Sequence, residues 1–177
     1  MNPIVLITGA SAGIGRATAL LLAKNDYDIL ATGRRNERLE SLEEEIRSRT
    51  RADVMTLAFD IRNPGAVKEA YHRLSGKWTG VDVLVNNAAI YAGLERRSLE
   101  DIDEAIWDKV MAVNVRGSFL TAKHAAPHMM KAKSGKIINI SSGTAYKGMP
   151  DMAAYVASKA AVLGLTRAAA ARTGLAN

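Results

Sequence analysis

Tyr155 and Lys159 lie four positions apart, and Ser142 precedes them in the chain. In a helix, residues i and i+4 share one face, so the phenol and the ammonium can point into the same site. A free phenol titrates near ~10, and a neighbouring ammonium favours the phenolate and brings its pKa closer to neutral pH, where acid–base catalysis is most efficient. A serine hydroxyl close to the phenol can hold the oxygen of a carbonyl or an alcohol. The alternative interpretation is a half-buried tyrosine beside a surface lysine, because this spacing also arises by chance.

Short apolar runs alternate along the chain with longer segments of helical spacing. The apolar runs predict five strands, at residues 4–7, 27–32, 54–59, 81–85 and 136–140. Helical spacing predicts helices at 11–24, 35–49, 64–74, 99–130 with an interruption near Gly117, and 152–172. Such alternation is typical of right-handed βαβ crossovers. The sequence therefore predicts an α/β fold with a doubly wound, Rossmann-like parallel sheet and helices on both faces.

Polar and glycine-rich segments follow all five predicted strands. In open parallel sheets, ligands bind outside the carboxyl ends of the strands. The segments that would meet at this edge are residues 8–15, 33–35, Asp60, residues 86–89 and residues 141–142. Five strand ends with this character indicate a ligand site more than a set of ordinary turns.

The first of these segments, Thr8-Gly9-Ala10-Ser11-Ala12-Gly13-Ile14-Gly15, connects a predicted strand to a predicted helix. Gly9 permits a tight turn, Gly13 lets the backbone approach a pyrophosphate, and Gly15 allows close packing of helix on strand. The N-terminus of the helix then offers unpaired N–H groups and a positive dipole to phosphate. The segment predicts a dinucleotide site, and the alternative is a plain glycine-rich turn.

The end of the second strand bears on the choice of cofactor. A protein that prefers NAD(H) places an acidic residue there for the ribose hydroxyls. This chain has Gly33 near that place, followed by Arg34 and Arg35. Guanidinium groups suit a 2′-phosphate because they are always charged and can bind it through two hydrogen bonds. NADP(H) is therefore favoured over NAD(H), although both arginines, and Arg35 in particular, can equally be the start of a charged helix.

Composition excludes several other classes of protein. At 177 residues, with 48% hydrophobic and 24% charged residues, the chain is one globular domain by length. It has no cysteine for disulfides or thiolate metal sites, and its three histidines do not show a chelating pattern, so we expect no metal. The net charge of +6 comes from basic residues interleaved with acidic ones, and aromatics are only 5%, which argues against nucleic acid. No apolar run is long enough for a membrane span, and we expect a cytoplasmic protein.

Taken together and in this order, these motifs resemble those of the short-chain dehydrogenase/reductase family, of the common non-extended type. The resemblance extends over the whole chain. The one departure is Ala89, where the family usually has glycine, which affects backbone freedom more than chemistry. The segments that carry the resemblance are Thr8–Gly15, Asp60, Asn86–Ala89, Asn114, Ser142 and the Tyr155/Lys159 pair.

The resemblance implies a role for each of these residues. Tyr155 would exchange a proton with the substrate oxygen, Ser142 would position that oxygen, and Lys159 would lower the phenol pKa and bind the nicotinamide ribose. Asn114 would hold a water that relays protons to solvent. The catalytic set is thus Asn114, Ser142, Tyr155 and Lys159, with Ser141 interpreted as a loop hydroxyl. The cofactor would be bound by Gly9, Ser11, Gly13, Ile14, Gly15, Arg34, Arg35, Asp60, Ile61, Asn87, Ala88, Tyr155 and Lys159.

Members of this family continue into a sixth strand, a substrate lid and a seventh strand, which this sequence does not contain. We therefore expect residues 1–177 to form a single dinucleotide-binding domain with five of the usual seven strands. Ile137, Ile138 and Ile140 would then form an exposed apolar edge. The implied activity is hydride transfer between NADP(H) and a carbonyl or secondary alcohol, as in 3-oxoacyl or small-ketone reductases, by a chain that forms homo-oligomers when completed.

Two alternatives to this activity remain open at the level of sequence. One is a truncated, catalytically weak nucleotide-binding module or pseudoenzyme. The other is a structural partner that completes its sheet with another chain.

Overall fold

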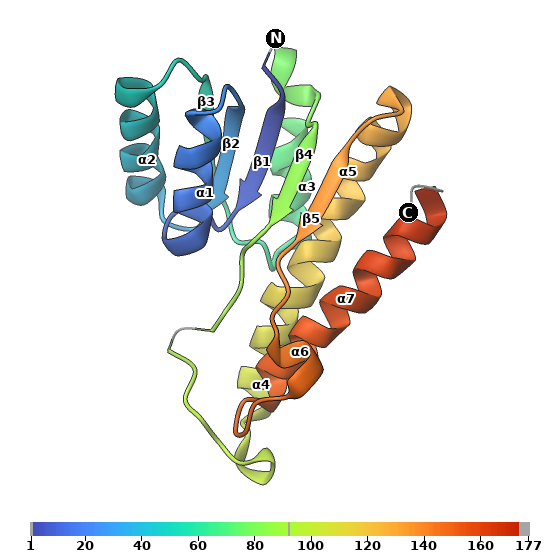
Figure 1. Ribbon diagram of the computed structural model, residues 1–177. Coiled ribbons are helices and arrows are strands. Elements are labelled where there is room, and N and C mark those ends of the chain that lie inside the picture. The colour runs from blue at the N-terminus through green and yellow to red at the C-terminus, as the bar shows by residue number, and fades with distance from the viewer. Residues whose placement is uncertain (1, 92, 174–177) are drawn as a thin grey trace.

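The computed structural model describes residues 2–91 and 93–173. Its strands are β1 (Ile4–Thr8), β2 (Asp28–Gly33), β3 (Val54–Ala58), β4 (Val83–Asn86) and β5 (Lys136–Asn139). All neighbouring strands are parallel, in the order β3-β2-β1-β4-β5 (Figure 1). The predicted α/β fold, a doubly wound Rossmann-like sheet, is confirmed.

Helices follow the strands in the order that the sequence predicts. Asn63 begins one of them by accepting a hydrogen bond from the Ala66 N–H at 3.1 Å, and Pro64 occupies its first turn, where a missing N–H costs nothing. The longer helices are α1 (Gly13–Ala23), α2 (Asn36–Arg49), α3 (Pro64–His72), α4 (Glu104–Met111), α5 (Ser118–Ala132) and α7 (Ala153–Thr173). The shorter turns are η1 (Gly76–Thr79), η2 (Leu99–Asp101), the π-helical η3 (Ala112–Gly117) and α6 (Thr144–Lys147).

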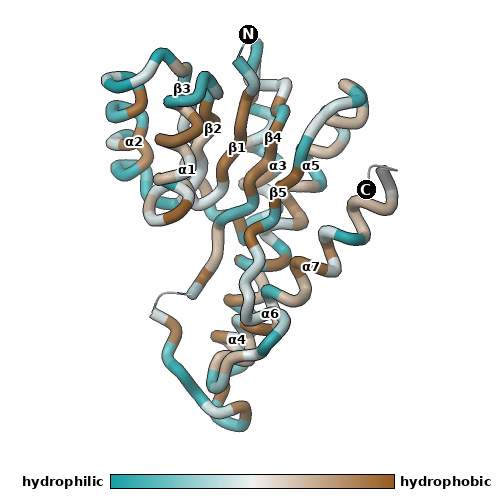
Figure 2. The backbone as a smooth tube through the Cα atoms, viewed as in Figure 1, coloured by the Kyte–Doolittle hydropathy of each residue, from teal (hydrophilic) through white to brown (hydrophobic). Residues whose placement is uncertain are grey.

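Two apolar layers enclose the sheet. Side chains that alternate along the strands divide between its faces: Val5 and Ile29 pack with α1 and α2, whereas Leu6 and Leu84 pack with α3 and α5. Figure 2 shows the strands as the hydrophobic centre, with hydrophilic residues along the outer side of α2. Because β1 is buried on both faces, its sequence is a continuous apolar run and not an alternating one. None of the described helices is long and apolar enough to cross a bilayer.

The helix predicted over 99–130 is wrong in its details. Asp103 accepts a hydrogen bond from the Ala105 N–H at 2.8 Å, so the α-helix begins only at Glu104. The interruption expected near Gly117 is a π-helical turn, η3, that separates α4 from α5. Single π-turns of this kind are frequent at functional sites, and η3 carries Asn114.

The exposed apolar edge expected at β5 is only partly present. Within the described residues the sheet ends at β5, and Ile138 is 46% exposed there. Ile137 and Ile140, however, pack against the two core clusters on either face of the sheet. Ile138 is therefore the exposed one of the three isoleucines, whereas Ile137 and Ile140 are half-buried.

Candidate active site

The carboxyl ends of the parallel strands open toward one edge of the sheet, which is its lower edge in Figure 1. The glycine loop follows β1, the arginine pair follows β2, and Asp60 follows β3. The segment that follows β4 extends below this edge before the chain returns as α4, beside α6 and the beginning of α7 (Figure 1). The topology thus gathers the predicted site residues at one end of the molecule.

Tyr155 and Lys159 share one face near the beginning of α7. Lys159 is 4% exposed, and its Nζ donates a hydrogen bond to the Ile140 carbonyl at 2.7 Å. The same Nζ lies 5.8 Å from the centre of the Tyr155 ring. Burial lowers the pKa of Lys159, because a low-dielectric environment disfavours the ammonium. The Lys159 amine is thus fixed beside the Tyr155 ring by its hydrogen bond to Ile140.

The two serines after β5 have different partners. The Ser141 hydroxyl donates to the Lys159 carbonyl at 2.9 Å, which ties the loop to α7. The Ser142 hydroxyl accepts from the Thr144 N–H at 3.2 Å and from the Thr144 hydroxyl at 3.0 Å. In both of these contacts Ser142 is the acceptor, so its own proton can be directed at a substrate oxygen. This geometry suits Ser141 as a loop hydroxyl and Ser142 as the positioning group.

Asn114 holds together three separate parts of the site. Its side chain is buried, accepts from the Ile90 N–H at 2.7 Å, and donates to the Ile90 carbonyl at 3.2 Å. It also donates to the Ser158 hydroxyl at 3.0 Å, and Ser158 donates to the Tyr155 carbonyl at 2.7 Å. The side chain expected to hold a relay water is therefore engaged by protein groups, and its direct effect is to fix the helix that carries Tyr155.

The glycine loop is packed tightly on its inner side and open on its outer side. A Cβ on Gly9, where φ is +68°, would lie 2.9 Å from the Ala88 Cα. A Cβ on Gly15 would lie 2.5 Å from both the Asn87 Nδ2 and the Gly9 carbonyl oxygen. At Gly13, where φ is +55°, a Cβ would meet nothing within 4 Å. The loop thus presents an open backbone surface at the N-terminus of α1, which fits a pyrophosphate.

Several other residues of the loop region were predicted to contact the cofactor. Ile14 is 68% exposed at the first turn of α1, whereas Ser11 is buried and accepts a hydrogen bond from the Arg35 guanidinium at 3.0 Å. The Asn87 side chain donates to the Thr8 carbonyl at 2.9 Å. The backbone N–H groups of Asn87 and Ala88 donate to the Thr8 hydroxyl at 3.1 and 3.0 Å. The segment after β4 and the glycine loop are thereby joined directly.

Asp60 and Ile61, which were predicted to meet the adenine, are both engaged by the protein. The Arg62 guanidinium binds both carboxylate oxygens of Asp60, with distances of 2.6 to 3.1 Å. These hydrogen bonds hold the pKa of Asp60 below its usual value, and the charge of Arg34 acts in the same direction. Ile61 is 8% exposed and packs with Val67, so its side chain faces the core. Any contact of Ile61 with an adenine would come from its backbone.

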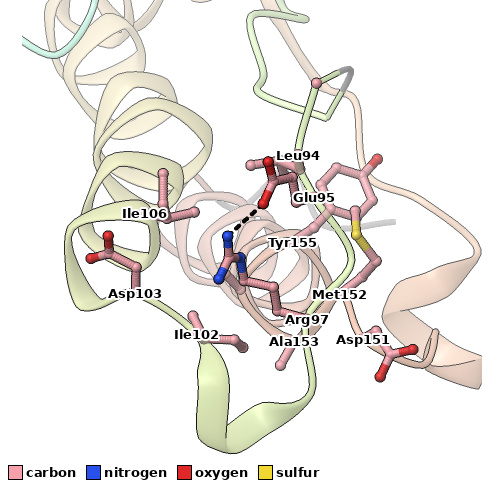
Figure 3. A pocket seen from close by; sticks show the side chains of 12 residues that line it. Leu94, Glu95, Arg97, Ile102, Asp103, Ile106, Asp151, Met152, Ala153 and Tyr155 are labelled. Carbon is pink, nitrogen blue, oxygen red and sulfur yellow. Dashed lines mark hydrogen bonds and ion pairs between the residues drawn. The ribbon is translucent and has the colours of Figure 1, made fainter.

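A cavity of about 300 Å³ lies beside Tyr155, between residues 93–97, the beginning of α4 and residues 151–155 (Figure 3). Leu94, Ile106 and Met152 contribute apolar walls, and Glu95 and Arg97 form an exposed ion pair of 2.5 Å. Figure 3 shows the Tyr155 hydroxyl directed away from Arg97, so the cavity borders the side of the ring rather than its reactive end.

Three residues of this region were not predicted from the sequence: Tyr91, Arg62 and Ser158. Ser158 is completely buried and links Asn114 to α7, and its position between Tyr155 and Lys159 is the one signal that pointed to it. Arg62 follows Asp60 by two residues, so a local ion pair could have been anticipated. Tyr91 packs on the Tyr155 ring, and nothing in its local sequence indicates this contact. Among the residues that the structure describes, no three His, Asp or Glu side chains are grouped to hold a metal ion.

The structure thus combines a parallel α/β sheet, a glycine loop after β1 and a Tyr/Lys pair on α7. The chain belongs to the short chain dehydrogenase family, whose pattern it matches over residues 3–176. It is 37% identical over 171 residues to the 3-oxoacyl-[acyl-carrier-protein] reductase FabG of Staphylococcus aureus, an alignment that covers 96% of this chain and 68% of that protein.

Solved structures agree with this assignment. The closed form of serine dehydrogenase complexed with NADP+ aligns with a TM-score of 0.89 and 29% identity, over 96% of this chain and 66% of that one. NAD+-bound xylitol dehydrogenase aligns with a TM-score of 0.91 and 31% identity, over 97% of this chain and 65% of that one. The homology supports a hydride-transfer oxidoreductase that uses a nicotinamide cofactor.

Proposed function

We propose that this chain transfers hydride between NADP(H) and a carbonyl compound or secondary alcohol. The observation that carries the proposal is the Tyr155/Lys159 arrangement on α7, with a buried ammonium 5.8 Å from the phenol ring. A phenol beside a fixed cation is suited to exchanging a proton with an alcohol or carbonyl oxygen near neutral pH. The bound cofactor supplies the hydride chemistry, and the residues of the chain orient the reactants.

In this proposal each residue has a limited task. Tyr155 exchanges the proton, and Ser142 donates a hydrogen bond to the same substrate oxygen. Lys159 would favour the phenolate and would bind the ribose of the cofactor. Asn114 acts through Ser158 and Ile90 and keeps α7 in place. The backbone of the glycine loop and Ile14 would hold the pyrophosphate at the N-terminus of α1.

The preference for NADP(H) is supported by the charges at the ends of β2 and β3. Arg34 and Arg35 are exposed after Gly33, and Asp60, which lies close enough to be influenced by the charge of Arg34, is already paired with Arg62. The region is therefore positive where a 2′-phosphate would lie. The NADP+ complex of a similar serine dehydrogenase agrees with this preference, whereas the similar xylitol dehydrogenase binds NAD+.

The substrate class follows less directly. The similarity to FabG supports a 3-oxoacyl compound or a related ketone. The chain spans 68% of the length of that reductase, and we propose the same class of substrate for it.

Replacing Tyr155 by phenylalanine tests the assignment most directly. The variant keeps the ring but has no exchangeable proton, so NADPH-dependent ketone reduction should fall by at least about a hundredfold, the range of general acid–base contributions. NADPH affinity, measured by fluorescence, should remain. Lys159→Ala should lower both, because its ammonium serves both the phenol and the ribose.

Tyr146→Phe is the matched control, since Tyr146 is 75% exposed on α6 and loses the same hydroxyl. A Tyr155→Phe protein that reduces ketones as fast as the parent would refute the assignment.

A further inference from the structure

Tyr91 contacts the ring of Tyr155. The two ring centres are 4.8 Å apart and the ring planes are tilted by 49°. Aromatic pairs favour tilted or offset arrangements with centres about 4.5–7 Å apart, so this is a favourable contact. Tyr91 is nevertheless 49% exposed, so about half of its surface stays uncovered although it packs on Tyr155.

The backbone around Tyr91 is held by the same elements that hold Tyr155. On one side, both backbone polar groups of Ile90 are bonded to the Asn114 side chain. On the other side, the Arg97 N–H donates to the Asp151 carbonyl at 3.0 Å, just before α7 begins. The segment that carries Tyr91 is therefore anchored, at Ile90 and at Arg97, to elements that also hold Tyr155.

The cavity beside Tyr155 is lined by charged as well as apolar side chains, and Leu94, Ile106 and Met152 are among the apolar ones. Met152 is 6% exposed and lines the same cavity as Tyr155 (Figure 3). A substrate whose carbonyl oxygen meets the Tyr155 hydroxyl would carry its substituents near the Tyr155 ring and the Tyr91 ring that packs on it.

We propose that Tyr91 determines the substrate class of this site. Its exposed ring forms an apolar wall beside Tyr155, and this wall selects carbonyl compounds that carry an aromatic substituent on the reacting carbon. The inference rests on the proposed function, because it takes Tyr155 as the residue that meets the substrate oxygen.

The test compares two ketones that share a reacting group, acetophenone and acetone, on the full 177-residue chain. Their affinities are measured by ligand-observed NMR with NADP+ at saturation, a complex in which no turnover occurs. Tyr91→Ala should weaken acetophenone binding about threefold to tenfold, the range expected for one aromatic contact, and acetone binding less than twofold. Tyr91→Phe should behave like the parent, since it keeps the ring.

Phe119→Ala is the control, because it removes another exposed aromatic side chain, on α5, and should alter neither affinity. Thermal melting checks that each protein is folded, and Tyr91→Ser replaces Tyr91→Ala if the latter is not. Equal loss for both ketones, no loss for either, or no ketone binding by the parent would each overturn the inference. So would a Tyr91→Phe variant as weak as Tyr91→Ala.

The same proteins distinguish this inference from the proposed function on which it rests. Selective loss of acetophenone binding without any NADPH oxidation by the parent would support the wall at Tyr91 and contradict the proposed activity. Reduction of both ketones by the parent, with Tyr91→Ala unchanged in its ratio of kcat/KM values, would support the activity and contradict the role of Tyr91.

Discussion

Replacing Arg34 by alanine should weaken the binding of NADPH and leave that of NADH almost unchanged. Arg34 follows Gly33 at the end of β2, is exposed, and is close enough to Asp60 for its charge to lower the pKa of that carboxyl. Because Arg62 already binds Asp60, the charge of Arg34 is available to a ligand. A 2′-phosphate is the part of the cofactor that would use it.

The size of the effect follows from the exposure of Arg34. A hydrogen bond to a charged group contributes about 1.5–3 kcal/mol, and exposure to solvent favours the lower end of that range. At about 1.4 kcal/mol per factor of ten, the Kd for NADPH should rise about tenfold. The Debye length falls from ~10 Å at 0.1 M salt to ~3 Å at 1 M, so the preference of the parent for NADPH should also shrink with added salt.

Arg35 should behave differently, because its side chain already has a partner. Its guanidinium donates to the Ser11 hydroxyl at 3.0 Å and so ties the start of α2 to the glycine loop. Arg35→Ala removes this support from the loop that would hold the pyrophosphate of either cofactor. We expect NADPH and NADH to lose affinity together, by about twofold to tenfold for one hydrogen bond.

Fluorescence titration of both reduced cofactors against the parent and the variants measures these effects. Arg51→Ala is the matched control, because Arg51 is an exposed arginine beyond the far end of α2. Equal affinity of the parent for NADPH and NADH would refute the reasoning. An Arg51→Ala variant that loses as much NADPH affinity as Arg34→Ala would show that the effect is one of net charge alone.

Two further predictions concern the framework. Burial alone would raise the pKa of Asp28, but hydrogen bonds, led by that of Lys77, outweigh burial and lower this pKa. Asp28 therefore stabilises the fold at pH values above the ordinary carboxyl pKa of 3.8, and this stabilisation is lost as the pH falls through the lowered pKa. Asp28→Asn should cost about 1–3 kcal/mol at pH 7 and flatten the dependence of urea unfolding on acid pH, and an unchanged dependence would contradict this. Ser158→Ala should leave the Asn114 amide without one of its hydrogen-bond acceptors and cost about 1–3 kcal/mol of stability. It should also lower kcat while the affinity for NADPH stays the same. An unchanged kcat would show that Ser158 is merely structural.

The sequence predicted the sheet well because its central strands are buried on both faces. Such strands are continuous apolar runs, and β1 and β2 are conspicuous ones. The helix over 99–130 was predicted less well, because its apolar spacing continues through two breaks. One break depends on the Asp103 cap, and the other, η3, accompanies contacts of Asn114 with residues 24 and 44 positions away. Local spacing does not contain such long-range partners.

In the candidate site, too, the sequence indicated local features but not long-range contacts. Residue types and spacing indicated the glycine loop, the arginine pair and the Tyr155/Lys159 pair as candidate site residues, because each of these lies within one short segment. They did not show that the Asn114 side chain is fully engaged, that Arg62 takes up Asp60, or that Tyr91 packs on Tyr155. Each of these depends on which segments meet in space, and therefore on the fold.

The residues at the end of β4 and just after it connect the two halves of the candidate site. Asn86 donates to the Asn139 side chain on β5 at 2.9 Å, and Asn87 donates to the Thr8 carbonyl beside the glycine loop at 2.9 Å. Ile90 is held by Asn114, the residue that reaches α7 through its own side chain. Within five consecutive positions the chain thus contacts the glycine loop and, through Asn114, the helix that carries Tyr155. Because one continuous segment makes these hydrogen bonds, it joins the loop that we propose to hold the cofactor to the helix that carries the proposed proton donor.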